Sequence, residues 1–328
     1  MKKEGLIIMS KKTYAQAINE AYVEAMKKNI NVFTFGEDIE FGAFQVTKGL
    51  VDKFGKSRVR NTPISESALV GAGVGVAVMG MRPVVEIQFA DVLAISMDHI
   101  VNSAAKIRYL SAGKTCCPLV IRAPMGIGLN LGMHHSQCVE SWFANVPGLT
   151  IACPSTPYDA KGLLLASIES NDPVLFLEHK SLYGIDGEVP DEYYTIPLGK
   201  GDIKKKGNTV TIVATSMMVN VVLEAAIILA KEGIEVEVVD PRTIKPLDKE
   251  LIINSVKKTG KVVIVHESAK FGGIGGEIAA ILAEEAIDYL KNPIIRVAGK
   301  EMPVPFGLEE CIAPQVEDIV NVVKRIIK

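Results

Sequence analysis

The segment Asn61-Thr-Pro-Ile-Ser-Glu-Ser places one carboxylate, Glu66, just before the apolar and glycine-rich run over residues 68–79. This pattern predicts that a helix begins near Glu66. A carboxylate in the first turn of a helix can simply interact with the helix dipole, which contributes up to about 1 kcal/mol. It can also be a half-buried group that hydrogen-bonds a ligand. Both interpretations stay open on these residues alone, and Glu66 is the first candidate for chemistry.

A second polar cluster, His134-His135-Ser136-Gln137, follows the glycine-rich loop Gly126-Ile-Gly-Leu-Asn-Leu-Gly. The Gly-x-Ser-x-Gly pattern of a nucleophile elbow is absent, which disfavours Ser136 as a lone nucleophile. No cluster of metal-binding residues stands at zinc-like spacing from the two histidines. The remaining functional interpretation is proton transfer or charge stabilisation by an imidazole in a cleft. Hydrogen bonds that merely close the loop are an equally good explanation.

Glycines at positions 71, 73 and 75 suggest a dinucleotide-binding loop at first sight. However, they do not open a helix directly after a strand, and no acidic residue follows at the expected distance. Close packing of a helix against its neighbours is therefore the favoured explanation. This observation argues against a nicotinamide-dependent oxidoreductase.

Two further polar motifs lie in the last third of the chain. Asp240-Pro-Arg-Thr-Ile-Lys-Pro-Leu-Asp248 is typical of a strand end, a rigid turn and a helix capped by Asp248. His266-Glu267 ends an apolar run just before Gly272-Gly-Ile-Gly-Gly. Open α/β sheets bind ligands at such strand ends, although an anion nest or a subunit contact explains the pattern as well.

The elements that must position these residues are short apolar runs that alternate with helical stretches. This alternation predicts an α/β protein, and runs that are apolar throughout predict parallel strands buried on both faces. Periodicity fails from residue 185 to 208 and then restarts, so we expect two doubly wound domains. The expected division is a flexible N-terminus over 1–12, a first domain over 13–185, a linker over 186–208 and a smaller second domain over 209–328. The expected helices are 13–28, 219–231, one after 248, and 276–290; the expected strands are 31–35, 83–87, 118–122, 149–153, 174–177, 210–214, 236–239 and 262–265.

Composition agrees with a large apolar core and excludes some partners. The chain has 328 residues, of which 48% are hydrophobic and 23% charged, and its net charge is −2. A length above about 300 residues favours two domains, and the near-neutral charge argues against nucleic-acid binding. The apolar run over residues 6–9 is too short to span a membrane or to form a signal-peptide core. Five cysteines without Cys-x-x-Cys spacing favour a reducing, cytoplasmic location.

In their order along the chain, these motifs resemble the beta subunits of the decarboxylating first component of 2-oxo-acid dehydrogenase complexes. These proteins form a transketolase-like, thiamine-diphosphate-dependent family. The resemblance spans nearly the whole chain and implies a pyrimidine-binding domain followed by a transketolase-type C-terminal domain. Its landmarks are Thr62-Pro-Ile-Ser-Glu66, Glu86-Ile-Gln-Phe89, Asn102-Ser-Ala-Ala-Lys106, His135-Ser-Gln137, Pro147-Gly148, Asp159-Ala-Lys-Gly162 and Asp240-Pro-Arg-Thr243.

The resemblance assigns roles to particular side chains. Glu66 is implied to hydrogen-bond the aminopyrimidine ring of thiamine diphosphate and to favour its imino tautomer, which activates the cofactor. His135 is implied to line the active-site channel and to stabilise intermediates or donate a proton during acyl transfer. Gln88 and Phe89 are implied to contact the cofactor together with Glu66 and His135. Some relatives also hold a potassium ion, and the matching positions here are Leu119, Ser167, Ile168, Ser170 and Asp172.

An absent motif indicates a partner. Thiamine enzymes hold the diphosphate through a divalent ion bound at Gly-Asp-Gly, whereas Gly201-Asp202 is followed by Ile203 here. The resemblance therefore implies that an alpha subunit supplies Mg²⁺ and the diphosphate site in an α2β2 heterotetramer. It also implies that a lipoyl acyltransferase core accepts the acyl group.

The substrate is less well determined than the class of enzyme. Pyruvate, with acetyl transfer to lipoyl groups, is the expected substrate, and a branched-chain 2-oxo acid and acetoin are the alternatives. Beta chains contribute less than alpha chains to the substrate pocket in this family. A non-catalytic scaffold subunit would not require both Glu66 and His135.

Overall fold

Helix α1 (Tyr14–Lys28) begins after Thr13 in the computed structural model, which describes residues 8–328. The Thr13 hydroxyl accepts a hydrogen bond from the Gln16 backbone N–H at 3.1 Å, and the Gln16 side chain accepts one from the Thr13 N–H at 2.9 Å. This reciprocal capping satisfies two N–H groups that the helix leaves unpaired. The predicted helix over residues 13–28 is confirmed.

The first sheet has seven strands in the order β12-β6-β7-β5-β4-β2-β3. All neighbouring strands are parallel except β12, which pairs antiparallel with β6. The parallel sheet expected from the fully apolar runs is therefore confirmed. Its strands are β2 (Val32–Gly36), β3 (Val59–Asn61), β4 (Arg82–Glu86), β5 (Val120–Met125), β6 (Thr150–Ala152), β7 (Val174–His179) and β12 (Thr243–Lys245).

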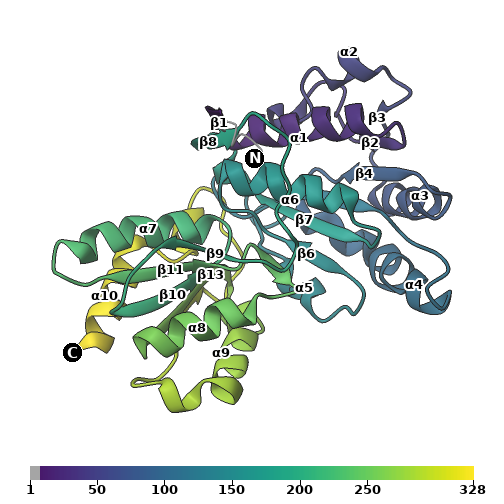
Figure 1. Cartoon of the computed structure of the whole chain (residues 1–328). Coiled ribbons are helices and arrows are strands. Elements are labelled where there is room, and N and C mark those ends of the chain that lie inside the picture. Colours follow the sequence, from purple (N-terminus) through teal and green to yellow (C-terminus); the bar gives the residue numbers. More distant parts are fainter. Residues whose placement is uncertain (1–7) are drawn as a thin grey trace, which may run out of the picture.

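Helices cover both faces of this sheet (Figure 1). Helix α6 (Pro157–Glu169) packs beside α1 on one face, and α3 (Glu66–Val78) packs against β4 on the other. A Cβ on Gly73 would lie 2.7 Å from Cγ2 of Val85, so glycine allows α3 to approach the sheet closely. The packing explanation for the glycine run is thus supported. The remaining helical segments of this half include α2 (Leu50–Phe54), η1 (Ala43–Gln45), η2 (Ala90–Ser96), η3 (Asp98–Ser103), η4 (Ala104–Lys106), α4 (Ile107–Leu110), α5 (Glu140–Ala144) and η5 (Lys180–Leu182).

The second sheet has five strands in the order β14-β13-β10-β11-β9, and only β9 is antiparallel to its neighbour. Helices α7 and α10 share a core with one face, and α8 and α9 share a core with the other. The elements are β9 (Asp202–Lys205), β10 (Val210–Ala214), α7 (Met217–Ala230), β11 (Val236–Asp240), α8 (Lys249–Thr259), β13 (Val262–Ala269), α9 (Ile274–Glu285), η6 (Ile287–Tyr289), β14 (Ile295–Gly299), η7 (Glu309–Cys311) and α10 (Val316–Ile327). The expected second α/β unit is confirmed.

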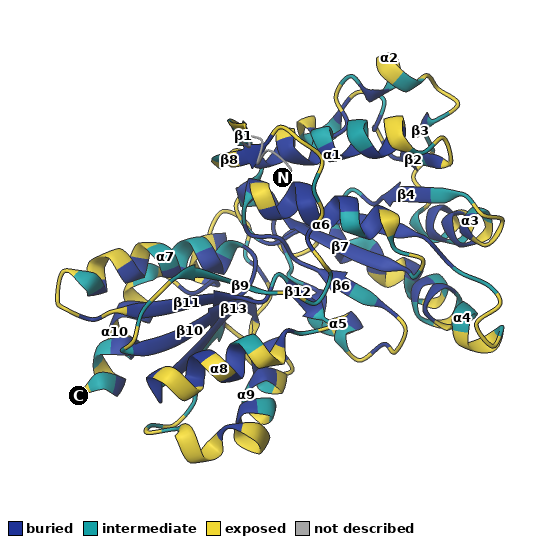
Figure 2. Ribbon diagram, in the orientation of Figure 1, coloured by how far each residue is buried: buried dark blue, intermediate teal, exposed yellow. Residues whose placement is uncertain are grey.

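The core crosses the boundary between the two units. One cluster of buried apolar side chains contains Ile121 and Ile151 of the first sheet together with Ile244, Ile252 and Ile264 of the second half. Figure 2 shows the strands of both sheets as largely buried, with exposed residues concentrated on outer helix faces and loops. The two halves therefore pack directly against each other through a shared apolar core.

Short edge strands correct the expected boundaries. Residues 9–12 fall within the expected flexible N-terminus, but strand β1 (Met9–Thr13) pairs antiparallel with β8 (Asp186–Pro190). Residues 186–208 are not a plain linker, since they contain both β8 and β9; β12, from within 209–328, joins the first sheet. Residues 1–7 lie outside the described part of the chain.

The missed strands share one physical property. They are edge strands or short pairings rich in charged residues, such as Met9-Ser-Lys-Lys-Thr13 and Asp202-Ile-Lys-Lys205. Edge strands have no need for an apolar pattern on both faces, and charges there prevent unwanted pairing. A search for apolar periodicity therefore misses them.

Among residues 8–328, no helix combines the length and apolar character needed to cross a membrane.

Candidate active site

The carboxyl ends of five parallel strands converge on one edge of the first sheet. Strands β7, β5, β4, β2 and β3 are consecutive neighbours there, so the loops that follow them meet. Open parallel sheets bind ligands at this edge because the loops and helix starts project from it. The candidate residues lie just after these strands, namely Glu37 after β2, Glu66 after β3, Gln88 and Phe89 after β4, the loop over residues 126–137 after β5, and Lys180 after β7.

Glu66 lies in the first turn of α3 and is half-buried. Ser65 caps this helix without a side-chain hydrogen bond, and Glu66 is the acidic residue of the first turn. The predicted helix start is therefore confirmed. The position favours a negative charge electrostatically and lies at the shared strand edge rather than in the helix body.

A second carboxylate, Glu37, lies close to Glu66. Glu37 directly follows β2 and is buried, and burial together with the negative charges of Glu66 and Asp38 raises the pKa of Glu37. Two carboxylates in one low-dielectric region disfavour double ionisation, so a proton is retained there more readily than in water. Sequence reasoning missed Glu37, although its place just after an expected strand was an available signal.

Gln88 and Phe89 connect the Glu37 region to the histidine loop. The Gln88 side-chain amide donates to the Glu37 carbonyl at 3.2 Å. The Phe89 ring lies edge-to-face with the His135 ring, with centroids 4.5 Å apart and planes at 79°. The Phe44 ring is 6.2 Å from Phe89 on another side. The structure thus brings together Phe89 and His135, two of the residues singled out in the sequence.

His135 is half-buried, whereas His134 is exposed. The Lys180 ammonium donates to the His135 carbonyl, and burial lowers the pKa of Lys180. The backbone and side-chain N–H groups of Gln137 donate to Asp91 at 3.1 and 2.9 Å. These contacts hold the backbone at His135 and on its C-terminal side, while its ring lies against Phe89.

Glu267 of the second half also holds this loop. Its carboxylate accepts from the Ile127 N–H at 2.9 Å, contacts Nε2 of His179 at 2.8 Å, and accepts from the Cys138 thiol at 3.3 Å. Burial alone would raise the pKa of Glu267, but His179 and these donors lower it overall. Glu267 thus makes a contact between the two halves of this chain, which differs from the ligand site, anion nest and subunit contact considered for His266-Glu267 from the sequence.

The Cys138, His179 and Glu267 side chains place one potential metal ligand each within 4.8 Å of one another. The Ser181 N–H donates to Nδ1 of His179 at 3.2 Å, so the ring proton resides on Nε2, where it is donated to Glu267. A protonated Nε2 cannot coordinate a metal. The cluster is therefore a hydrogen-bonded contact between the two halves.

Beneath the site, three fully buried side chains cross-link three central strands. Arg122 on β5 forms ion pairs with Glu86 on β4 and Glu178 on β7, and all three side chains are 0% exposed. The Tyr183 hydroxyl donates to Glu178 at 2.7 Å. Burial acts against the charge of Arg122, but the two carboxylates raise the pKa of its guanidinium well above the ordinary value. The loops that carry the site begin at the ends of these strands. The triad therefore holds those strands together directly below the site.

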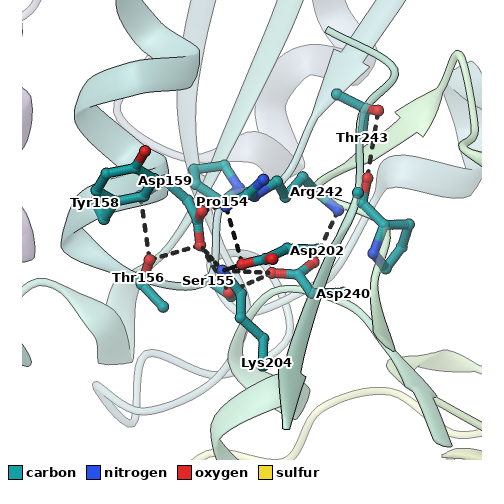
Figure 3. A network of polar contacts seen from close by, with 12 residues as sticks. Pro154, Ser155, Thr156, Tyr158, Asp159, Asp202, Lys204, Asp240, Arg242 and Thr243 are labelled. Carbon is teal, nitrogen blue, oxygen red and sulfur yellow. Dashed lines mark hydrogen bonds and ion pairs between the residues drawn. The ribbon is translucent and has the colours of Figure 1, made fainter. Parts of the chain in front are cut away.

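A second charged network joins the two halves (Figure 3). Asp159 of α6 pairs with Arg242 at 2.7 Å and with Lys204 at 2.6 Å, and Arg242 also pairs with Asp202 at 3.0 Å. Asp240 accepts hydrogen bonds from the Ser155 hydroxyl and, at 2.8 Å, from the Arg242 N–H. The two sequence landmarks at Asp159 and at Asp240-Pro-Arg-Thr243 are thus partners in space. Their role is to join the halves, not to line the strand edge.

The positions expected to hold potassium contact other protein groups in this structure. The Arg82 guanidinium donates to the Ile168 carbonyl at 2.9 Å and to the Ser170 carbonyl at 2.8 Å. The Leu119 carbonyl accepts from the Val174 N–H, the Ser167 hydroxyl donates to Leu163, and Asp172 pairs with Arg108. The Arg82 guanidinium thus satisfies two of the carbonyls expected to bind the ion, and potassium binding stays a prediction. No local pattern could indicate this, because Arg82 is distant in the chain.

Unsatisfied polar atoms show that the strand edge suits a polar ligand. Within residues 8–328, Oε1 of Glu37, Oγ1 of Thr62 and Oδ2 of Asp91 are buried without a hydrogen-bond partner. Such atoms cost about 1–3 kcal/mol each unless a water or ligand satisfies them. Together with Glu66 and the Phe89 ring, they suit an aromatic heterocycle that carries both donors and acceptors. An aminopyrimidine fits this description.

The fold and this site define a class. Residues 10–185 match the model of the transketolase pyrimidine-binding domain, and residues 199–319 match the transketolase C-terminal domain. A solved split-gene transketolase, described as an inactive beta4 tetramer, superposes with a TM-score of 0.79 at 26% identity, covering 96% of this chain and 97% of that chain. The protein is thus of the transketolase-like, thiamine-diphosphate-binding class.

Curated relatives narrow the class. The 2-oxoisovalerate dehydrogenase subunit beta of Bacillus subtilis is 49% identical over 298 residues, which cover 90% of this chain and 91% of that protein. The mitochondrial pyruvate dehydrogenase E1 component subunit beta-2 of rice, Oryza sativa, is 45% identical over 321 residues, covering 95% and 85%. The chain belongs to the family of beta subunits of the first component of 2-oxo-acid dehydrogenases, which are oxidoreductases that use thiamine diphosphate.

Proposed function

We propose that this chain supplies the pyrimidine half of a thiamine-diphosphate site for oxidative decarboxylation of pyruvate and acyl transfer to lipoyl groups. The observation that carries the proposal is the convergence of Glu66, Glu37, Phe89 and His135 at one strand edge, in a chain of this family. Unsatisfied buried oxygens at the same edge support a heterocyclic ligand there.

The residues present suggest a division of roles. When bound, thiamine diphosphate would supply the nucleophilic carbon and the electron sink, and the protein orients it and tunes its protonation. Glu66 would hold a hydrogen bond to the pyrimidine ring, with Glu37, whose pKa is raised by burial, close beside it. Phe89 and Gln88 would form the wall of the site between Glu37 and His135. His135 would donate a proton to, or hydrogen-bond, the oxygen of the transferred acyl group.

We propose that the diphosphate half of the site belongs to an alpha subunit. This chain has no Gly-Asp-Gly motif, and Gly201 and Asp202 instead lead into strand β9 of the second sheet. Mg²⁺ would therefore be bound by the alpha subunit, and the active species would be an α2β2 heterotetramer. A lipoyl-bearing acyltransferase core would receive the acyl group.

The substrate proposal rests on the relatives. Several relatives that are 42–45% identical are named pyruvate dehydrogenase E1 beta subunits, including those of rice and Dictyostelium. The 49% identity to a 2-oxoisovalerate dehydrogenase beta subunit favours a branched-chain 2-oxo acid as the second candidate.

The test is to reconstitute the chain with its alpha subunit. We expect decarboxylation with a dye acceptor that depends on thiamine diphosphate and Mg²⁺, with kcat/KM higher for pyruvate than for 2-oxoisovalerate or acetoin. Preference for 2-oxoisovalerate would replace pyruvate by the second candidate. A complex that assembles but turns over none of the three substrates would contradict the proposed function.

A further inference from the structure

The loop that carries His135 has an unusual backbone. Every second residue from Gly126 to Gly132 has a positive φ, with values of 84° at Gly126, 117° at Gly128, 53° at Asn130 and 74° at Gly132. Alternation of left-handed residues with ordinary ones turns successive N–H groups toward a common centre, which produces a concave anion-binding nest. The three glycines make this conformation accessible, because residues with a Cβ rarely adopt it.

The anion in this nest is a side chain of the protein itself. The N–H groups of Gly128, Asn130 and Gly132 donate to the Glu309 carboxylate at 2.8, 2.9 and 2.9 Å. The Ser136 hydroxyl donates to the same carboxylate. Glu309 is 1% exposed and lies in η7, between β14 and α10 of the second half. Four donors therefore converge on one buried carboxylate from a distant part of the chain.

The Glu309 carboxylate binds residues that precede and follow His135 in the sequence. Gly132 binds Glu309 through its N–H and accepts from the His135 N–H at 3.2 Å through its carbonyl. Ser136 is the residue directly after His135. Burial alone would raise the pKa of Glu309, but Ser136 and the three N–H groups lower it overall, so the residue stays ionised at neutral pH.

We propose that Glu309 is a positioning residue that sets the place of the His135 imidazole for acyl transfer. This inference rests on the proposed function, because it assigns to Glu309 an effect exerted through His135. Glu309 does not touch the Phe89–His135 contact; it acts by fixing the backbone that presents the ring. The second half of the chain thereby takes part in a site that the first half carries.

The test compares Glu309→Gln with the matched control Glu310→Gln in the reconstituted complex. Glu310 is the exposed neighbour of Glu309, so both variants lose one negative charge at nearly the same place. The side-chain amide introduced by Glu309→Gln would direct its own N–H groups at the N–H groups of the loop, which disrupts the nest. We expect a loss of roughly tenfold to a hundredfold in the rate of acyl transfer to a lipoyl domain, as misplacement of a catalytic group produces, with the control near wild type.

A double-variant cycle separates positioning from general destabilisation. If Glu309 acts through His135, Glu309→Gln should lower acyl transfer by less than about twofold in a His135→Ala background, because residues that act as one unit are not additive. Multiplicative losses in the double variant would overturn the inference, because they would mean that the two residues act independently. If Glu309→Gln does not yield folded protein, Ser136→Ala removes one donor of the nest and is judged by the same cycle.

Hydrogen exchange of the complex gives a readout that does not depend on turnover. We expect Glu309→Gln to accelerate amide exchange in peptides over residues 126–137, while peptides from β10 and β13 keep their protection. Unchanged exchange in the loop would overturn the inference even if activity falls. Loss of all turnover in the wild-type complex would instead reject the proposed function, and the exchange data would still decide whether Glu309 orders the loop.

Discussion

At the scale of the residue, the site combines a carboxylate pair with an imidazole on an aromatic wall. Glu37 and Glu66 bring two carboxyl groups close together. Burial first, and then the negative charge of Glu66, raise the pKa of Glu37. His135 is held at its backbone, by Lys180 and the loop, while its ring rests against the edge of Phe89. The carboxylate pair and the imidazole therefore lie at different parts of the site, with the Phe89 ring beside the imidazole.

Glu66→Ala should lower turnover of the reconstituted complex by about 10²–10⁴-fold, the usual size of a lost acid–base contribution. Folding should survive, because a first-turn carboxylate adds typically about 0.3–1 kcal/mol to the helix and about 2 kcal/mol at most. The control is Glu317→Ala, which removes an exposed first-turn carboxylate of α10. Steady-state kinetics and thermal unfolding check both. Near wild-type turnover in Glu66→Ala would remove this residue from the mechanism.

His135→Ala should slow acyl transfer to a lipoyl domain at least as much as decarboxylation with a dye acceptor. The reason is that a proton donor beside the acyl oxygen matters most when that group leaves for its acceptor. The exposed neighbour variant His134→Ala serves as control. Both reactions are measured on the same preparation. A change of less than about twofold in each, far below an ordinary proton-transfer loss, would mean that the histidine only closes the loop.

At the scale of the element, the parallel sheet brings the residues of the site together. Its strand order places β7, β5, β4, β2 and β3 side by side, so residues from well-separated parts of the chain end at one edge. The Glu86–Arg122–Glu178 triad ties β4, β5 and β7 together just beneath that edge. A buried ion triad adds little net stability over an apolar replacement, but it is costly to break.

Arg122→Met should destabilise the chain by about 3–5 kcal/mol, because it leaves two carboxylates buried without a cation. The matched control is Lys28→Met, which breaks the exposed pair with Glu169 and should cost at most about 1 kcal/mol. Urea unfolding followed by circular dichroism compares the two variants. Equal, small effects would show that Glu86 and Glu178 are neutralised in the folded protein.

At the scale of the whole molecule, the two halves are joined by a continuous apolar core, by carboxylates of the second half that hold the His135 loop, and by the network in Figure 3. Asp240 is the unusual member of that network. Burial first, and then the negative charge of Asp159, raise its pKa from 3.8 to about 6, although Lys204 opposes the shift.

The raised pKa of Asp240 predicts the pH dependence of stability. Between about pH 4 and 6 the folded state holds a proton that the unfolded state has released, so stability from this group falls as pH rises and is lost above about 6. A shift from 3.8 to about 6 corresponds to roughly 3 kcal/mol. Asp240→Asn cannot ionise, so its stability relative to wild type should increase by most of that amount between about pH 4 and 7. Urea titrations at both pH values measure the difference, and a constant difference would contradict the assignment.

The isolated chain should bind thiamine diphosphate far more weakly than the complex with its alpha subunit. The diphosphate requires a divalent ion with oxygen ligands, for which this sequence has no Gly-Asp-Gly motif. One charge-assisted hydrogen bond at Glu66 contributes only about 1.5–3 kcal/mol, whereas even millimolar affinity needs about 4 kcal/mol. Calorimetry with Mg²⁺, with and without the partner, tests this. Micromolar binding or turnover by the single chain would mean that the division of the site is different.

The sequence by itself determined the parallel sheets, the capped helices and the place of Glu66 at a helix start. It could do so because strand burial and helix capping each depend on residues that are close together in the sequence. Phe89 and His135 were both singled out in the sequence, but their contact depends on β4 and β5 lying side by side.

Only the tertiary structure decided which charges meet. Four contacts pair residues that are far apart in the chain: Glu309 with its nest, Glu267 with the loop, Arg82 with the Ile168 carbonyl, and Asp159 with Arg242. The strands β1, β8 and β9 were not predicted for a related reason. Their polar sequences have no apolar pattern, and only pairing with a partner strand makes them strands. A charged side chain has the same local pattern whether it faces water or a distant partner, so its role is set by the fold.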